Sequence, residues 1–198
     1  MLENLGSNVK IICDRIAKLL SKKDRIVVAI DGNCGSGKST LGRRIANIFN
    51  ANLFCMDDFF LTTELRTVSR MNEVGGNVDY VRFKNEIIKG INNRKPFQFR
   101  PYDCKIQSFS SPINVTPKSV NIIEGSYSLH PTLIEFYDLK IFLEISQKLQ
   151  QKRILARNGP DVLERFQNQW IPLENLYFKT FLIKEKCDIV CCLNAQLS

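Results

Sequence analysis

The segment from Gly32 to Thr40 constrains this chain more than any other part of its sequence. It reads Gly-Asn-Cys-Gly-Ser-Gly-Lys-Ser-Thr and matches the pattern G-x-x-x-x-G-K-[ST]. Glycines let such a loop curl so that its N–H groups, and the N-terminus of the helix that follows, point at phosphate oxygens. The pattern therefore predicts a nucleotide-binding loop, in which Lys38 reaches the β- and γ-phosphates and Ser39 ligates Mg²⁺. The expected binding residues are Gly32, Asn33, Cys34, Gly35, Ser36, Gly37, Lys38, Ser39 and Thr40.

The neighbours of this loop distinguish a binding loop from a chance glycine-rich turn. Residues 25–31 form an apolar, β-branched run typical of a buried strand, and residues 39–49 have the spacing of a helix. Further apolar runs predict strands at 52–56, 120–123, 139–145 and 188–193. Helical patterns occupy 8–21, 80–91, 146–158 and 161–185, the last with a break expected at Pro172. Strands that alternate with helices predict an α/β fold with a parallel sheet covered on both faces.

Two segments carry little periodicity. Residues 59–78 include Gly75-Gly76 and are expected to form a loop. Residues 94–118 contain four prolines and predict an irregular excursion with short strands at most. Neither segment interrupts the alternation of strands and helices that defines the sheet.

Acidic residues follow two of the predicted strands. Asp57 and Asp58 come after 52–56, and Glu124 follows 120–123. Ligands bind beyond the carboxyl ends of the strands in such sheets, so these residues are candidates for the site. Asp57 is placed to accept the proton of an attacking hydroxyl, and the alternative is a helix cap or a turn. Glu124 is placed to hold Mg²⁺ through water, and the alternative is a cap on the next turn.

Charge and cysteine content limit the partners and the compartment. The formal net charge of +8 favours anionic partners, but Lys and Arg form no long block, so no nucleic-acid function is expected. No apolar run is long enough to span a membrane, and the N-terminus lacks the pattern of a signal peptide. Seven cysteines without CxxC spacing predict a reducing compartment and no zinc site. A cytoplasmic location is expected, and a homo-oligomer is left open.

The order of several motifs gives a more specific expectation. After the loop come Asp57-Asp58-Phe59-Phe60, Asn77-Val78-Asp79, Arg100-Pro101-Tyr102-Asp103 and Ile122-Ile123-Glu124-Gly125. This order resembles the uridine kinase family from about residue 24 to the C-terminus. Phosphoribulokinases, pantothenate kinases and nicotinamide riboside kinases are relatives with similar loops. The resemblance implies one P-loop kinase domain over residues 1–198, with the three-layer P-loop NTPase fold: a parallel sheet of about five strands, helices on both faces and a small helical lid at approximately 153–170.

The resemblance also implies roles for single residues. Asp57 falls on the family's catalytic base, Asp79 on its ribose-binding aspartate and Tyr102 on its base-stacking tyrosine. Uridine kinases place a histidine that reads the pyrimidine shortly after this tyrosine, and here Gln107 stands in that place. From the residues alone, Asp79 reads equally well as the N-cap of a helix from Tyr80, and Tyr102 as a half-buried loop residue.

Arginines are expected in the lid. The candidates are Arg153, Arg157 and Arg165, and the first two share a helix face at i,i+4. They would neutralise charge on the transferring phosphoryl group, and the alternative is solvated helix charge. His130 is the only histidine of the chain and is expected to be a structural loop residue.

These observations predict an ATP- and Mg²⁺-dependent kinase that transfers the γ-phosphate to a hydroxyl of a nucleoside-like acceptor, with uridine or cytidine as first candidates. The expected catalytic residues are Lys38, Asp57, Arg153 and Arg157; the acceptor-binding residues are Asp57, Asp79, Tyr102, Gln107 and Glu124; the metal ligands are Ser39 and Glu124. One alternative is a kinase of the same superfamily that acts on another sugar, vitamin or nucleoside. The other is an ATP-binding switch protein, which would need no acceptor-binding carboxylates.

Overall fold

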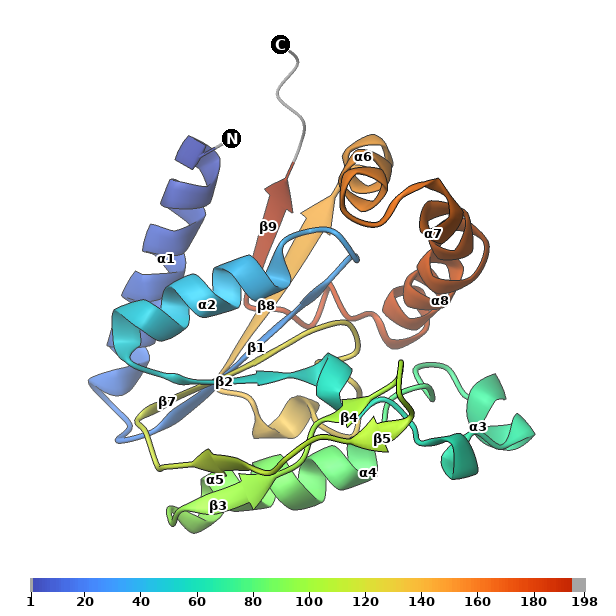
Figure 1. The fold of residues 1–198 in the computed structure, drawn as a ribbon. Helices are drawn as coiled ribbons and strands as arrows, with labels where there is room; N and C mark the ends of the chain where they lie inside the picture. Colours follow the sequence, from blue (N-terminus) through green and yellow to red (C-terminus); the bar gives the residue numbers. More distant parts are fainter. Residues whose placement is uncertain (1, 194–198) are drawn as a thin grey trace.

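Five parallel strands form the central sheet of the protein (Figure 1). The computed structural model describes residues 2–193. The strand order is β2 (Asn52–Cys55), β7 (Val120–Glu124), β1 (Ile26–Gly32), β8 (Leu139–Ile145) and β9 (Ile189–Leu193). Every residue of β1 is buried between its two neighbours and the two helical layers, which is why residues 26–30 form a continuous apolar run. The predicted α/β fold with a five-stranded parallel sheet is confirmed.

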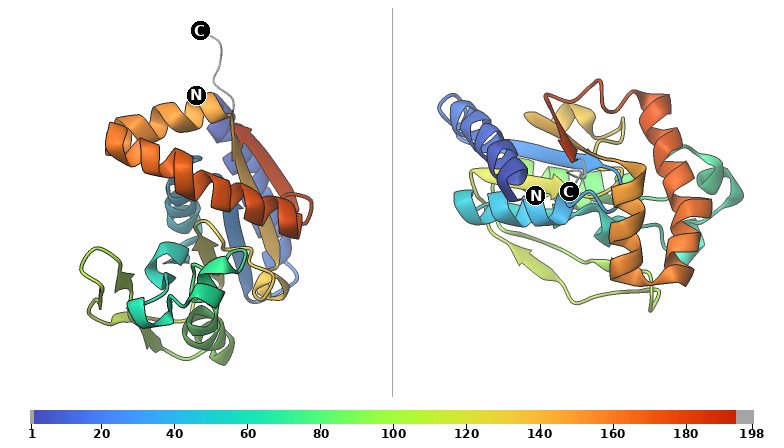
Figure 2. Two further views of the ribbon diagram at one scale, coloured as in Figure 1. Left: turned by 90° about the vertical axis from the view of Figure 1, so that its right-hand side faces the viewer. Right: turned by 90° about the horizontal axis from the view of Figure 1, so that it is seen from above.

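Helices cover both faces of the sheet, as the views in Figure 2 show. One face carries α1 (Leu2–Leu20) and α2 (Lys38–Phe49), and the other carries α4 (Tyr80–Phe83), a π-helical turn (Lys84–Ile88), α5 (Lys89–Asn93) and α8 (Ile171–Phe181). Alternate residues of β1 serve the two layers. Ile26, Val28 and Ile30 belong to the core under α1 and α2, whereas Val27 and Ala29 belong to the core on the opposite face.

A helical lobe extends beyond the carboxyl end of β8 and leads into α8. It consists of α6 (Gln147–Asn158), α7 (Pro160–Arg165) and a π-helical turn (Phe166–Trp170). The approximate bounds expected for a lid, 153–170, fall within this lobe. The break predicted at Pro172 is wrong, because Pro172 lies in the first turn of α8. A proline costs no helical hydrogen bond there, since the first N–H groups of a helix have no partner within it.

The excursion between β2 and β7 is built from short elements. A 3₁₀ turn (Met56–Phe59) follows β2, and the predicted loop at 59–78 contains a second 3₁₀ turn (Thr63–Leu65) and α3 (Val68–Asn72). The proline-rich part forms two antiparallel pairs, β3 (Phe97–Phe99) with β6 (Ile113–Val115) and β4 (Tyr102–Asp103) with β5 (Ser108–Phe109). A further 3₁₀ turn (Ile134–Phe136) precedes β8. Within residues 2–193, no helix is long and apolar enough to cross a membrane.

Candidate active site

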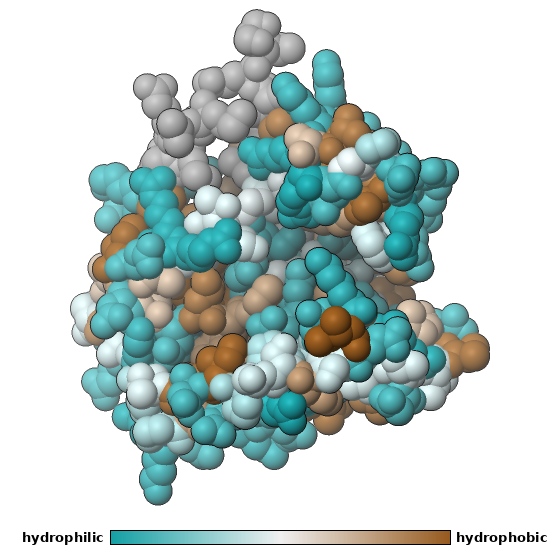
Figure 3. Space-filling view, viewed as in Figure 1, coloured by the Kyte–Doolittle hydropathy of each residue, from teal (hydrophilic) through white to brown (hydrophobic). Residues whose placement is uncertain are grey.

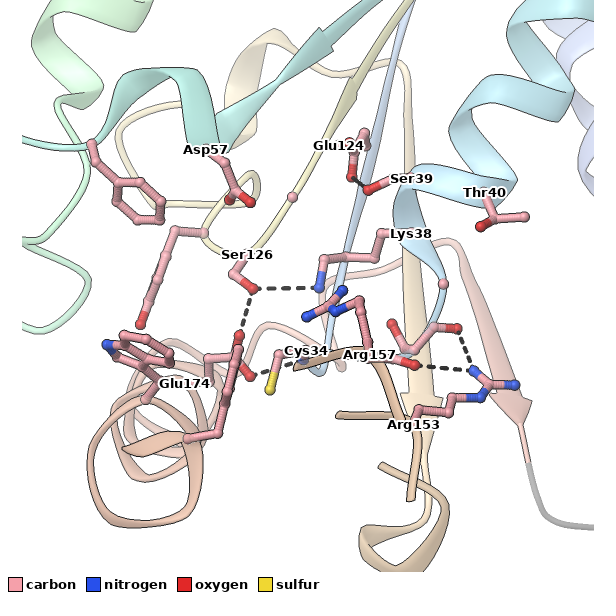
Figure 4. A pocket seen from close by; sticks show the side chains of 18 of the residues that line it. Cys34, Lys38, Ser39, Thr40, Asp57, Glu124, Ser126, Arg153, Arg157 and Glu174 are labelled. Carbon is pink, nitrogen blue, oxygen red and sulfur yellow. Dashed lines mark hydrogen bonds between the residues drawn. The ribbon is translucent and has the colours of Figure 1, made fainter. Parts of the chain in front are cut away.

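One cavity of about 790 Å³ lies where the carboxyl ends of β1, β2 and β7 face the N-terminus of α2 and the helical lobe. The space-filling view shows this face of the molecule hollowed below the lobe (Figure 3). Cavities of this size hold small molecules in many proteins. Figure 4 shows Lys38, Asp57 and Arg157 directed toward this space, with Glu124 turned to Ser39 and Arg153 turned to the backbone of the loop.

The loop between β1 and α2 owes its shape to glycine. Gly32 has φ 131° and lies against β8, where an added Cβ would come within 2.1 Å of the Leu143 carbonyl oxygen. Gly37 has φ 98° and immediately precedes α2. These left-handed conformations favour glycine, because a side chain would strain the backbone. The loop therefore turns sharply and directs the first turn of α2 into the cavity.

Lys38 is held in place by neutral oxygen atoms. Its Nζ donates to the carbonyl oxygens of Gly32 at 2.7 Å and Asn33 at 3.1 Å, and to Ser126 Oγ at 3.3 Å. The residue is buried, and within residues 2–193 no carboxylate forms an ion pair with it. Its charge is therefore oriented toward the cavity without being neutralised, as a phosphate-binding lysine requires.

One hydroxyl of the loop and two arginines of α6 could bind an anion in the cavity. The hydroxyl of Ser36 is buried and has no hydrogen-bond partner among the described residues. Arg153 donates to the carbonyl oxygens of Gly35 at 3.0 Å and Ser36 at 3.3 Å, which ties α6 to the loop. Arg157 also lines the cavity, and its Nε donates to Asn158 Oδ1 at 2.7 Å. Phosphate oxygens would satisfy the Ser36 hydroxyl, since buried donors are rarely left unpaired.

Ser39 and Glu124 meet at the end of β7. Ser39 Oγ donates to Glu124 Oε2 at 3.1 Å, and both residues line the cavity. Burial raises the pKa of Glu124, the charge of Asp57 raises it further, and the hydrogen bond from Ser39 lowers it. A hydroxyl and a carboxylate are oxygen donors of the kind that Mg²⁺ prefers, so this pair fits the metal position predicted for it.

Asp57 lies directly after β2 and faces the cavity. Its side chain is open to the cavity, yet the protein around it removes much of the water near the carboxylate. This desolvation raises the pKa of Asp57, Lys38 and Arg157 lower it, and the charge of Glu174 raises it. The carboxylate thus lies within electrostatic range of the loop lysine and of the lid, where a proton acceptor would be useful.

Asp58 has a different environment, although it is the next residue. It does not line the cavity, and its backbone carbonyl accepts from Arg82 Nη2 at 2.7 Å. Burial and the charge of Asp57 raise the pKa of Asp58 to about 6, while Arg82 lowers it. Only the first of the two adjacent aspartates is therefore positioned toward the predicted phosphate loop.

Three predicted acceptor-binding residues lie outside the cavity lining. Asp79 caps α4, accepting from Arg82 N at 2.9 Å. Tyr102 is buried in β4 with its ring centroid 5.3 Å from that of Phe109. Gln107 lies in the exposed turn between β4 and β5, within 3.3 Å of Thr63 Oγ1. The structure therefore supports the cap reading of Asp79, and the acceptor roles of all three stay predictions.

Several cavity residues were not anticipated from the sequence: Phe60, Asn77, Ser126, Tyr127, Phe166, Trp170 and Glu174. Ser126 and Tyr127 directly follow β7, so the rule that ligands bind beyond strand ends would have found them. Trp170 comes from the end of the lobe and Glu174 from α8. Glu174 carries no local signal, because a carboxylate in the first turn of a helix ordinarily favours the helix dipole.

Two further predicted residues have structural contacts. His130 is buried, its ring stacks on Tyr80 with centroids 4.3 Å apart, and it does not line the cavity. Its Nδ1 lies 3.0 Å from Thr132 Oγ1. Arg165 places its guanidinium 5.3 Å from the ring centre of Trp170 rather than in the cavity lining. The structural reading of His130 agrees with these contacts.

Comparison with known proteins relates this chain to one family of kinases in sequence and in fold. The model of the phosphoribulokinase/uridine kinase family matches residues 27–165. A uridine kinase from Oceanobacillus iheyensis is 29% identical over 157 residues, which cover 74% of this chain and 72% of that protein. A phosphoribulokinase from Synechocystis sp. is 25% identical over 138 residues, or 67% of this chain and 42% of that protein. The structure of a possible uridine kinase from Bacillus stearothermophilus has TM-score 0.69 and 18% identity, covering 94% of this chain and 98% of that one, which shows a shared fold.

Proposed function

Because this chain belongs to the phosphoribulokinase/uridine kinase family, we propose that it transfers the γ-phosphate of ATP to a hydroxyl group of a small nucleoside-like acceptor. Uridine and cytidine are the first candidates, supported by the similarity to a uridine kinase. The observation that carries this proposal is the arrangement in one cavity of Lys38, the Ser39–Glu124 pair and Asp57. A lysine for phosphate, oxygen donors for a metal and a proton acceptor are the parts that phosphoryl transfer to an alcohol requires.

In this proposal the protein binds the nucleotide through the loop. Backbone N–H groups and the Ser36 hydroxyl bind phosphate oxygens, and Lys38 lies between the β- and γ-phosphates. Ser39 and, through water, Glu124 would hold Mg²⁺. The ion would neutralise charge on the β- and γ-phosphates and help to orient them.

Transfer then proceeds by exchange of one phosphorus–oxygen bond for another. The acceptor oxygen bonds to the γ-phosphorus as the bond from that phosphorus to the β–γ bridging oxygen breaks, and ADP leaves. The hydroxyl proton passes to the carboxylate of Asp57, whose raised pKa makes it a better proton acceptor than an ordinary aspartate. Arg153 and Arg157 stabilise the charge on the moving phosphoryl group from the lid side.

The residues expected to recognise the base of a nucleoside lie outside the cavity lining. Gln107 replaces the histidine that reads the pyrimidine in uridine kinases, and neither Gln107 nor Tyr102 lines the cavity. A kinase of the same family that acts on another sugar, vitamin or nucleoside is therefore the second candidate. A switch protein that only hydrolyses ATP is less well supported, because it would not need Asp57 beside the phosphate loop.

The test is an ADP-release screen with ATP and Mg²⁺ against nucleosides, sugars and vitamins, with a no-acceptor control. We expect release to depend on one class of hydroxyl compound, and mass spectrometry of the product to show one added phosphoryl group. ADP release at the same rate without any acceptor would favour the switch protein and remove the kinase proposal.

We also propose a cytoplasmic location. All seven cysteines are free thiols, and two of them, Cys34 and Cys191, are buried. Burial raises the pKa of both thiols, so they behave as small apolar side chains rather than as reactive groups. Unpaired buried thiols suit a reducing compartment.

A further inference from the structure

Glu174 is a buried carboxylate that the proposed mechanism does not use. It lies in α8 and is only 4% exposed, yet it reaches the cavity. Its Oε2 accepts from the backbone N–H of Cys34 at 2.9 Å, and its Oε1 accepts from Ser126 Oγ at 2.5 Å. Ser126 in turn accepts from Lys38. A carboxylate this buried is costly unless it is hydrogen-bonded, so its two donors explain how it is tolerated there but leave open what its charge does.

The charges that line the cavity are divided between two sets of elements. The cationic residues lie on α2 and α6 and are Lys38, Arg43, Arg153 and Arg157. The carboxylates Asp57 and Glu174 come from the segment after β2 and from α8, and Figure 4 shows them on the side away from Arg153 and Thr40. Glu124 is turned to Ser39. Among the described lining residues, no cation comes from the elements that carry Asp57 and Glu174.

Aromatic rings accompany these two carboxylates. Phe60 follows Asp57 closely in sequence, Tyr127 follows Ser126, and Trp170 lies one helical turn before Glu174. The Trp170 ring packs edge-on against Phe166 with centroids 4.5 Å apart. Aromatic faces attract cations and stack on planar groups, and carboxylates add to the attraction for positive charge.

We propose that Glu174 determines which acceptor charge the site prefers. The site binds a hydroxyl compound that carries a ring and is uncharged or positively charged, and it discriminates against compounds that carry a phosphate or carboxylate. This inference rests on the proposed kinase function and narrows its substrate class. It also distinguishes this chain from its phosphoribulokinase relative, whose name implies a phosphorylated sugar as acceptor.

The ternary complex makes the discrimination stronger. With ATP bound, Lys38 and the two lid arginines face the triphosphate, so their charge is engaged there. An anionic group on the acceptor would then have the γ-phosphate on one side and Asp57 and Glu174 on the other. Charges of like sign within a few ångströms repel strongly in a partly desolvated site, whereas a cationic group at the same place is attracted.

Acceptor binding can be measured by the fluorescence of Trp170, which is the only tryptophan of the chain and lines the cavity. The protein with Mg²⁺ and a non-hydrolysable ATP analogue is titrated with three uridines that differ in charge at one position: 5-aminomethyluridine, 5-hydroxymethyluridine and 5-carboxyuridine. We expect the cation to bind at least as tightly as the neutral compound, and about tenfold or more tighter than the anion. Equal affinities, tighter binding of the anion, or no fluorescence response to any of the three would overturn the inference.

Glu174→Gln tests the residue itself, and Glu164→Gln is the matched control. Gln can still accept a hydrogen bond from the Cys34 N–H, but it carries no charge. Glu164 is an exposed carboxylate of α7 that does not line the cavity. We expect Glu174→Gln to reduce the cation-to-anion affinity ratio severalfold and Glu164→Gln to leave it unchanged; equal ratios in Glu174→Gln and wild type would refute the role of Glu174. If Glu174→Gln does not fold, the titration of the wild-type protein with the three uridines still tests the charge selectivity.

The pH–rate profile is a second measurement, which distinguishes an electrostatic role of Glu174 from a merely structural one. The charged groups near Asp57 are Lys38 on α2, Arg157 on α6, Glu174 on α8, Glu124 at the end of β7 and the adjacent Asp58. Because Glu174 raises the pKa of Asp57, removing its charge should move the acid limb of the pH–rate profile to lower pH, and Glu164→Gln should not. Binding is read by fluorescence and transfer by ADP release, so a correct charge order without ADP release would refute the kinase function separately from the charge selectivity.

Discussion

The phosphate end and the acceptor end of the cavity are assembled in different ways. The proposed phosphate end comes mainly from one continuous segment, residues 34–40, with Arg153 and Arg157 of α6 beside it. The acceptor end comes from four separate segments: 57–60, residue 77, 126–127 and 170–174. Contacts within this end span long stretches of chain, as in the bond from Ser126 to Glu174, which are 48 residues apart, and the bond from the Cys34 N–H to Glu174 joins the two ends.

This difference has a physical consequence for specificity. A loop fixed by glycine geometry and central strands can hardly change without losing phosphate binding. An end assembled from loop and lobe segments can change one side chain at a time while the sheet stays intact. In the proposed function, nucleotide binding therefore depends on the part of the cavity that is fixed by the sheet, and the choice of acceptor on the part whose side chains can change one at a time.

The largest effect is expected at the phosphate end, from Lys38→Ala. In the proposed mechanism Lys38 is the point charge on the β- and γ-phosphates, so its loss should reduce kcat by about 10³-fold or more. The fold should survive, because Lys38 donates hydrogen bonds to neutral oxygens and forms no ion pair among the described residues. Turnover is measured by ADP release and folding by circular dichroism. A folded Lys38→Ala protein with full activity would contradict the kinase assignment.

The next largest loss of turnover is expected from Asp57→Asn, at the place where the two ends of the cavity meet. The amide keeps the shape of the side chain but cannot take the hydroxyl proton, so kcat should fall by about 10²- to 10⁴-fold. Nucleotide affinity should change little, since the loop supplies those contacts. Steady-state kinetics and nucleotide titration measure the two quantities separately.

Asp58→Asn is the internal control for this prediction. Asp58 is adjacent in sequence but does not line the cavity. Its replacement should cost far less turnover than the Asp57 change. A larger loss for Asp58→Asn would show that the second aspartate is the proton acceptor.

The contrast between the two ends also explains how much the sequence could predict. All five strands lie within two residues of their predicted bounds, because continuous apolar runs are typical of strands buried on both faces. The phosphate loop and the positions of Asp57 and Glu124 followed from the same reasoning, since each comes directly after one of these strands.

The acceptor end could not be predicted in this way. Tyr102 is buried by the pairing of β4 with β5, two strands of two residues each that have no periodicity to detect. Glu174 looks like an ordinary first-turn carboxylate of a helix, and only the tertiary fold brings it to Cys34 and Ser126. Pro172 was read as a break, although its position in the first turn of α8 is one where proline is favourable.

A smaller effect, on the stability of the fold, is expected from a cluster formed by Arg70, Glu73, Tyr80 and His130. Arg70 stacks on Tyr80 at 3.9 Å, Tyr80 stacks on His130, and the Tyr80 hydroxyl donates to Glu73 at 2.8 Å. These contacts fix the segment that carries Asn77 into the cavity. Burial lowers the pKa of His130 to about 4 from 6.5; Glu73 opposes this shift, and Arg70 adds to it.

This shift predicts a loss of stability in acid. Between about pH 6.5 and pH 4 the unfolded chain binds a proton at His130 and the folded chain does not. Stability contributed by the neutral histidine is therefore complete above about pH 6.5 and lost as the pH falls toward 4, by up to about 3 kcal/mol. Urea unfolding of wild type and His130→Gln across this range measures the difference, in which the carboxylates common to both proteins cancel. Parallel pH dependences for the two proteins would refute the assignment.

The smallest effect concerns Asp79, which has two proposed roles at the acceptor end. Its carboxylate caps α4 through the N–H of Arg82 at 2.9 Å and lies 3.8 Å from Arg82 Nε. The family resemblance makes it an acceptor ligand as well, and Asn77, two residues earlier, lines the cavity. Asparagine caps helices about as well as aspartate, whereas alanine does not. Two substitutions at this one position can therefore separate the two roles.

We expect Asp79→Ala to lose about 1 kcal/mol of stability and Asp79→Asn to lose less, because asparagine keeps the cap and gives up only the charge contact with Arg82, which Glu86 also pairs. If Asp79 also binds the acceptor, Asp79→Asn should raise the KM of the acceptor by roughly two- to tenfold, because an amide accepts a hydroxyl hydrogen bond less strongly than a carboxylate. The KM of ATP should not change. A wild-type acceptor KM in Asp79→Asn would assign this residue to the helix cap alone, and the acceptor end would then depend on Asp57, Glu174 and the aromatic residues that line the cavity.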